Sequence, residues 1–254
     1  MFKFYFKSKV KVIIIWTIFL TFFLFASLTK YDTFASDVEG TKQLMDSFPR
    51  VIKVVYGMND IDITTIGGYF SVVSLYITII IGIYAGILGS KIIYEEEDLM
   101  TSEFIFTRPV SRSKVYFTKL IVAFVSITLL NIFVIGANYL ILKTQYELFD
   151  EFILLGILQY VICILALAIG LFFSSLKNNR FATVASAGIV TILFLIRTYG
   201  ELKEINFSYI TPFYAFSYSN IINDFNIIYV IYYVIIAIVL VVLGNIILNK
   251  RDIK

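Results

Sequence analysis

The chain has 254 residues, of which 59% are hydrophobic and 15% are charged, and its mean hydropathy is +0.89. A soluble globular domain usually carries about 25% charged residues, so this composition excludes that class and indicates a polytopic helical membrane protein. A transmembrane barrel is excluded as well, because its strands alternate apolar and polar residues, whereas the apolar runs here are continuous.

Residue types that carry much of enzyme chemistry are scarce. The chain has no histidine, so the usual serine triad and zinc hydrolase sites are excluded. The single cysteine, Cys163, lies in an apolar run, and we interpret it as a small core residue that cannot form a disulfide within the chain. The net charge is +3, but the basic residues gather at the boundaries of apolar runs, which favours lipid headgroups over nucleic acid as their partners.

The first apolar run predicts a membrane span at about residues 10–29. It follows a basic start that contains Lys3, Lys7, Lys9 and Lys11. A cleaved secretory signal is the alternative, since Ala26 and Ser27 are small. The run is longer than the roughly 7 to 15 residues of a signal core, and no clear A-x-A site follows it. We therefore favour an uncleaved helix with its N-terminus in the cytoplasm.

Residues 30–68 form a polar stretch that predicts an external segment with one or two short interfacial helices. Its acidic residues are Asp32, Asp37, Glu39, Asp46, Asp60 and Asp62. Pro49 and Gly57 interrupt the stretch, and the apolar residues between them provide a modest apolar surface. The segment is too short to form an independent domain.

The second span is predicted at about residues 69–93, and it is rich in glycine. Its Gly82-x-x-x-Gly86 spacing lets another helix approach closely. We interpret this spacing as packing within the bundle of this chain rather than as a dedicated dimer motif.

A charged segment at residues 94–119 separates two long apolar runs. It begins with four consecutive carboxylates, Glu95 to Asp98, and continues with an amphipathic stretch at helical spacing that includes Leu99, Met100, Glu103 and Phe104. Pro109 ends this stretch, because proline cannot donate to a helix and disfavours helical geometry before it. Neighbouring helical residues point about 100° apart, so the four carboxylates cannot converge on one metal ion, and we interpret them as a solvated face.

Four further apolar runs complete a prediction of six spans, at about residues 120–142, 152–176, 181–197 and 227–248. Arg197 ends the fifth run, where we expect its side chain to snorkel to the headgroups. Residues 198–226 are polar but rich in tyrosine and phenylalanine, which suits the headgroup level. We therefore predict that this external segment dips into the outer leaflet.

Three polar residues, Thr128, Asn131 and Asn138, share one face of the third predicted span, because steps of three and seven return to the same side of a helix. Gln159 in the fourth span is a candidate partner. One interpretation is a polar line along a substrate path. The other, which we favour, is hydrogen bonding between helices, worth on the order of 0.6 kcal/mol for each bond.

Six spans place both termini on one side, and the basic residues predict that this side is cytoplasmic. With the N-terminus inside, two thirds of the 21 Lys and Arg residues are cytoplasmic, in keeping with the positive-inside rule. They are Lys3, Lys7, Lys9, Lys11, Lys91, Arg108, Arg112, Lys114, Lys119, Lys177, Arg180, Lys250, Arg251 and Lys254. The predicted fold class is thus an all-α polytopic membrane protein with six transmembrane helices and cytoplasmic termini.

Three motifs resemble the permease subunits of type-2 ABC exporters. The first is T-x-E-x-x-x-x-x-P-V-S-R at residues 101–112, preceded by the acidic run and followed by Lys119 at the start of the third span. The second is LAIGLFFSSLKNNRFA at residues 167–182, and the third is ITPFY at residues 210–214, before the last span. The resemblance covers most of the chain from Gly68 onward.

The resemblance implies a dimeric permease whose cytoplasmic loop forms a coupling helix that docks in a groove on a separate ATPase. The implied coupling residues are Glu96, Glu97, Asp98, Leu99, Met100, Thr101, Glu103, Phe104, Pro109 and Arg112. The sequence has no phosphate loop, so ATP and Mg are expected on the partner ATPase, with no cofactor and no catalysis in this chain. The family also places re-entrant helices between the last two spans.

The sequence therefore predicts a single transmembrane permease domain over residues 1–254, in a bacterial plasma membrane. The expected cargo is hydrophobic or amphipathic, such as a peptide toxin, an antimicrobial peptide or a drug. Expected partners are the ATPase, a second permease copy in a homodimer or heterodimer, and lipids. The alternative is an ATP-independent membrane protein such as a channel, an intramembrane enzyme or a sensor component.

Overall fold

The computed structural model describes residues 2–98, 112–176 and 179–250, and in these ranges it contains helices and no strand. Six helices are long and apolar enough to cross a membrane. They are α1 (Phe2–Leu28), α5 (Ile66–Asp98), α7 (Arg112–Gln145), α8 (Phe152–Leu176), α9 (Asn179–Lys203) and α12 (Ile227–Lys250). The predicted all-helical class with six candidate spans is confirmed.

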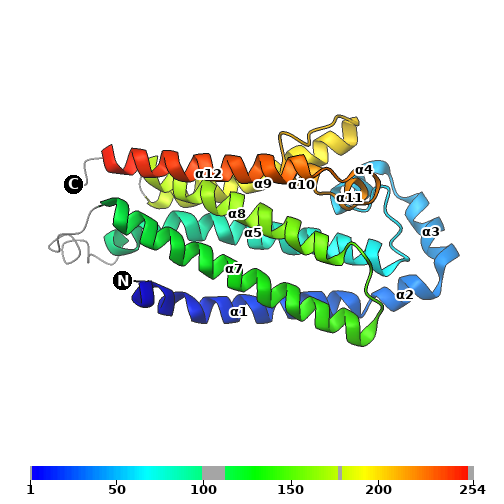
Figure 1. Cartoon of the computed structure of the whole chain (residues 1–254). Helices are drawn as coiled ribbons and strands as arrows, with labels where there is room; N and C mark the ends of the chain where they lie inside the picture. Colours follow the sequence, from blue (N-terminus) through cyan, green and yellow to red (C-terminus); the bar gives the residue numbers. More distant parts are fainter. Residues whose placement is uncertain (1, 99–111, 177–178, 251–254) are drawn as a thin grey trace.

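Successive long helices run in opposite directions, so their connections lie alternately at the two ends of the bundle (Figure 1). We call one end the terminal end, since it holds the start of α1 and the end of α12 together with the end of α5 and the start of α7 (Figure 1). The opposite end, which we call the capped end, carries five short helices. They are α2 (Tyr31–Ser36), α3 (Val38–Ser47), α4 (Arg50–Tyr56), α10 (Pro212–Ala215) and α11 (Tyr218–Asp224).

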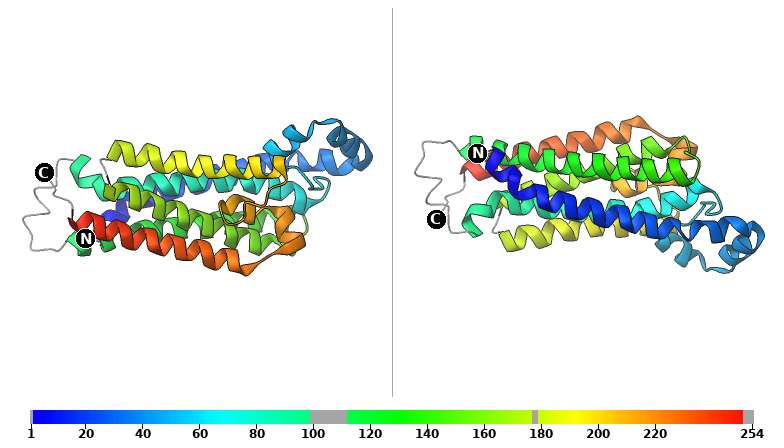
Figure 2. Two further views of the ribbon diagram at one scale, coloured as in Figure 1. Left: turned by 90° about the horizontal axis from the view of Figure 1, so that it is seen from above. Right: turned by 90° about the horizontal axis from the view of Figure 1, so that it is seen from below.

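Helix α8 forms the centre of the bundle. It is the most buried of the six candidate spans: 72% of its most apolar 18-residue stretch is buried, compared with 17% for the corresponding stretch of α12. Its most extensive contact is with α5, and α7, α9 and α12 surround this central pair (Figure 2). The inner helices are therefore defined by protein contacts, and the outer ones leave much of their apolar surface for lipid or a partner.

Glycines allow α5 and α8 to approach each other closely. A Cβ atom built on Gly170 would lie 2.1 Å from the carbonyl oxygen of Gly86, and one built on Gly89 would lie 2.4 Å from the carbonyl oxygen of Leu167. A Cβ on Gly82 would meet Val190 of α9 at 3.4 Å. The interpretation of this glycine-rich face as packing within the chain is therefore confirmed.

The capped end is tied to the long helices by tyrosine hydroxyls and by an acidic turn. Tyr69 of α5 donates to the carbonyl oxygen of Ser27 at 2.8 Å, which joins the end of α1 to the start of α5. In the loop before α5, Asp62 Oδ1 accepts from the amide of Thr64 at 3.0 Å and from its hydroxyl at 2.5 Å. The Thr64 hydroxyl and Lys42 hold the pKa of Asp62 below its usual range, so this turn contributes most when the carboxylate is ionised.

Candidate functional site

The predicted coupling residues fall at the terminal end of the bundle or outside the described residues. Glu96, Glu97 and Asp98 are the last residues of α5, and Arg112 is the first residue of α7. The structure describes the backbone of these four residues but not their side chains. Those that lie outside the described residues are Leu99, Met100, Thr101, Glu103, Phe104 and Pro109. The helices that flank this stretch end beside the start of α1 and the end of α12 (Figure 1).

Three buried side chains anchor the end of α5 and the start of α7, the two helices that flank residues 99–111 in the sequence. Tyr94 of α5 donates to the carbonyl oxygen of Ser174 on α8. Tyr116 of α7 donates to the carbonyl oxygen of Val241 on α12 at 3.0 Å. Lys119 Nζ donates to the carbonyl oxygen of Ile93 at 2.6 Å and lies 5.6 Å from the centre of the Tyr5 ring. These contacts join α5, α7, α8, α12 and α1 at one level.

Sequence reasoning missed this anchoring. It treated Lys119 only as the basic start of a span, yet its side chain is buried, as are those of Tyr94 and Tyr116. The available signal was a tyrosine or lysine at each boundary of the charged segment. Such residues place an apolar body in the bundle and a polar tip at the interface.

A polar cluster lies inside the bundle where α5, α7 and α8 meet. Gln159 Nε2 donates to Asn131 Oδ1 at 3.0 Å, and the Thr78 hydroxyl lies 3.4 Å from Gln159 Oε1. The thiol of Cys163 points at Asn131 Oδ1 from 3.9 Å, and Asn131 Nδ2 donates to the carbonyl oxygen of Ile127. The buried Cys163 is thus a small core residue, as its position in an apolar run predicted.

The other two residues of the predicted polar line do not join this cluster. The Thr128 hydroxyl pairs with Tyr160 OH at 2.6 Å and also donates to the carbonyl oxygen of Phe124. Asn138 is buried, and its Oδ1 accepts no hydrogen bond within the described residues. The structure therefore brings Asn131 and Gln159 together and leaves Thr128 and Asn138 in separate environments.

Removing both partners of the central hydrogen bond is expected to cost less than the sum of the two single changes. Asn131→Leu and Gln159→Leu should each lower stability, and a double-mutant cycle should give a coupling free energy of about 0.6–1.7 kcal/mol. Thermal unfolding in a fixed detergent measures it. Asn138→Leu is the matched control, expected to be neutral or stabilising because its buried oxygen has no partner. Zero coupling between Asn131 and Gln159 would contradict the assigned bond.

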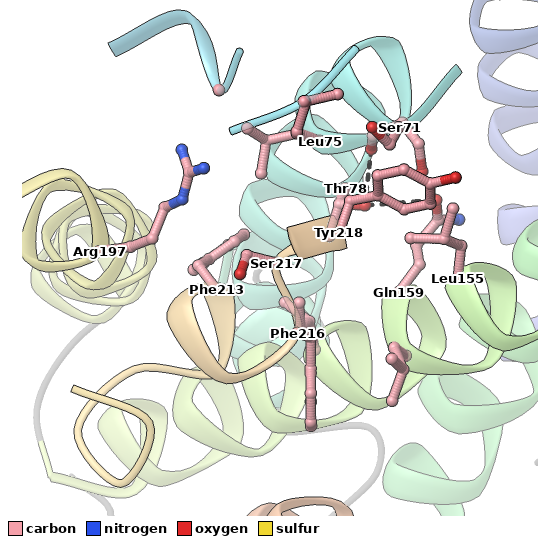
Figure 3. Close-up of a pocket in the computed structure, with 15 residues that line it drawn as sticks. Ser71, Leu75, Thr78, Leu155, Gln159, Arg197, Phe213, Phe216, Ser217 and Tyr218 are labelled. Atoms are coloured by element: carbon pink, nitrogen blue, oxygen red, sulfur yellow. Dashed lines mark hydrogen bonds between the residues drawn. The ribbon is translucent and has the colours of Figure 1, made fainter. Parts of the chain in front are cut away.

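A small cavity extends from this cluster toward the capped end. Its volume is about 40 Å³. Leu75 and Thr78 reach it from α5, Gln159 comes from α8, and Arg197 approaches from α9 on the other side (Figure 3). Phe213 and Phe216 close it from the segment that contains α10. Since one water needs roughly 10–15 Å³, the cavity has room for a few waters but not for a drug-sized ligand.

Arg197 forms a buried ion pair, and the prediction that its side chain snorkels to the headgroups is wrong. Arg197 Nη2 lies 2.8 Å from Glu201 Oε1, and the exposed fractions of the two side chains are 3% and 13%. Arg197 Nε and Nη1 and Glu201 Oε2 have no further partner within the described residues. Glu201 lies one turn after Arg197 on the same helix and offsets its charge. Helix α9 continues to Lys203, past the predicted end of the fifth span.

In the described ranges, no three His, Cys, Asp or Glu side chains gather in an arrangement that would hold a metal ion. The polar cluster supplies amide, hydroxyl and thiol groups, and the cavity adds one neutralised ion pair. These groups can form hydrogen bonds inside the bundle and hold a few waters.

Six long apolar helices around a hydrophobic core, with one small polar cluster among them, define a polytopic membrane protein. The model of the ABC-2 family transporter protein family matches residues 5–253. The chain therefore belongs to the ABC-2 family of transporter permeases and is a multi-pass membrane transporter subunit. Comparisons with curated proteins and with solved structures gave no significant match. The resemblance stated from the sequence motifs is confirmed.

Proposed function

We propose that this chain is the permease subunit of an ATP-driven exporter of the bacterial plasma membrane and works with a separate ATPase subunit. The observation that carries the proposal is the family match over residues 5–253. An ABC transporter needs ATP hydrolysis, and the sequence contains no phosphate loop. ATP and Mg therefore bind on the partner, and this chain binds no cofactor.

In this proposal residues 94–119 face the cytoplasm and form the coupling segment. The helices on both sides of it end at the terminal end of the bundle, where the distribution of basic residues favours the cytoplasm. The hydrogen bonds of Tyr94, Tyr116 and Lys119 support the coupling role, because they join this segment to α8, α12 and α5. A push by the ATPase would then move several spans together.

We place the cargo route at the face between two permease copies. The cavity of about 40 Å³ between α5, α8 and α9 is too small for a peptide or a drug, so we do not place the route through this part of the described bundle. The outer helices α1, α9 and α12 expose large apolar side chains that suit a second copy, lipid, or a hydrophobic or amphipathic cargo. Homodimers and heterodimers are both compatible with this arrangement.

The proposal predicts that a tagged chain purified from its native membrane brings an ATPase with it. Glu103→Lys combined with Phe104→Ala should reduce the stimulated ATP turnover of the reconstituted complex at least about tenfold, with membrane insertion intact, because the apolar residues provide most of the docking energy. ATP turnover and ATPase co-purification measure the effect. Glu147→Lys, which reverses the charge of an exposed residue at the capped end, is the control. Unchanged turnover in the double variant would refute the coupling assignment.

A further inference from the structure

Helix α4 at the capped end has one buried side and one exposed apolar side. Val54 is fully buried against the bundle. The exposed side consists of Val51, Ile52, Val55 and Tyr56, with exposed fractions of 56%, 39%, 43% and 52%. A group of four large apolar side chains on one short helix is costly to leave in water, which indicates a nonaqueous neighbour.

Helix α4 contacts the end of α9, and Arg50 forms hydrogen bonds across this contact. Arg50 Nη1 donates to Glu204 Oε1 at 2.6 Å, and Arg50 Nη2 donates to the carbonyl oxygen of Glu201 at 3.1 Å. The C-cap of α4 is Gly57 at a φ of +72°, where a Cβ would lie 2.6 Å from Leu75 and 3.6 Å from Arg197 Nη1. The position of α4 is therefore set by both of its ends.

The C-terminal end of α4 lies beside membrane-spanning parts of the bundle. Tyr76 OH of α5 donates to the carbonyl oxygen of Tyr56 at 3.3 Å. At 1.5 Å per residue, Leu75 lies about 14 Å along α5 from its start, and Arg197 lies about 9 Å before the end of α9. Both residues belong to the candidate spans Ile66–Tyr94 and Arg180–Lys203. The neighbours of Gly57 are therefore not at the outermost edge of the bundle.

Helix α3 provides a contrast within the same external segment. Its sequence, VEGTKQLMDS, is largely polar, and it projects beyond the ends of the long helices (Figures 1 and 2). Leu44 on this helix is 49% exposed, which is close to the exposed fraction of Val55 on α4. The two helices thus present comparable side chains at different positions relative to the spans.

We infer that α4 is inserted into the membrane interface, with its exposed apolar side against lipid. The occupant is lipid because α4 packs on α9, whose Ile192, Leu195 and Tyr199 are also exposed along a candidate span. The membrane boundary therefore passes through residues 30–68, with α4 in lipid and α3 in water.

Tryptophan fluorescence in the full chain tests this inference. In a Trp16→Phe background, Val55→Trp and Leu44→Trp place the single tryptophan on α4 or on α3. The proteins are reconstituted in nanodiscs of phosphatidylcholine with or without brominated acyl chains. We expect Val55→Trp to show a blue-shifted emission, at least twofold quenching by the brominated lipid and little quenching by iodide. Leu44→Trp should show the opposite pattern.

The other outcomes overturn the inference. If Val55→Trp is quenched by iodide as strongly as Leu44→Trp, α4 lies in water. If neither the lipid nor iodide quenches it, the apolar side of α4 is covered by protein, for example by a second copy of this chain. Tyr56→Trp repeats the measurement with an aromatic replacement at a second exposed position, in case Val55→Trp does not fold.

Discussion

Replacing Gly170 with alanine is expected to destabilise the bundle by about 1–3 kcal/mol, although alanine is the better helix former. The added methyl group would lie 2.1 Å from the carbonyl oxygen of Gly86 and 3.0 Å from its carbonyl carbon. Backbone atoms cannot rotate away as the end of a side chain can, so α5 and α8 must separate. That separation weakens the most extensive helix contact in the described part of the chain.

Glycines elsewhere in the bundle provide matched controls. A Cβ atom on Gly136 of α7 or on Gly188 of α9 would have no neighbour within 4 Å. Gly136→Ala and Gly188→Ala should therefore be neutral or stabilising by up to about 1 kcal/mol, since only helix propensity changes. Size-exclusion chromatography after heating in detergent compares the three variants. A Gly170→Ala variant as stable as the wild type would contradict the close helix contact.

Breaking the buried ion pair of α9 from either side is expected to cost about 3–5 kcal/mol. Arg197→Leu removes the ion-pair partner of the Glu201 carboxylate, and Glu201→Leu removes the ion-pair partner of the Arg197 guanidinium. The side chains are 3% and 13% exposed, so water compensates little for the lost partner. Thermal unfolding should show a fall of roughly 10 °C for each single variant.

The Arg197→Leu, Glu201→Leu double variant shows whether the single variants lose stability through the broken ion pair or through altered packing. Leucine at both positions removes both charges together, so we expect a smaller loss than in either single variant. Lys42→Ala is the control, because its bridge to Asp62 is exposed and should contribute less than about 1 kcal/mol. Additive losses in the Arg197→Leu, Glu201→Leu double variant would show that the two charges do not interact.

The spans were predictable because long apolar runs have few alternatives in a chain of this composition. The end of α9 was not predicted from its apolar run, because the helix continues through the i,i+4 pair of Arg197 and Glu201 to Lys203. That spacing was visible in the sequence. A charge at the end of an apolar run is compatible with a helix that continues when an opposite charge lies one helical turn away.

The polar site was predictable in part. The spacing of Asn131 and Asn138 placed them on one face of the third span, with Gln159 as a candidate partner. It could not show that Gln159 bonds to Asn131 and that Asn138 Oδ1 accepts no bond within the described residues. That choice depends on how α7 and α8 are aligned. The anchoring roles of Tyr94 and Tyr116 depend on α8 and α12, which lie far away in the sequence. The predicted coupling role of Glu103 and Phe104 stays a prediction.

The central position of α8 has a consequence for biosynthesis. Helix α5 enters the membrane well before α8 is translated, so its surface around Gly86 and Gly89 meets lipid until Gly170 arrives. Helices α1 and α7, which contact each other in the folded bundle, are also translated before α8. The nascent chain thus passes through a stage in which its first half has been translated but lacks its main internal partner.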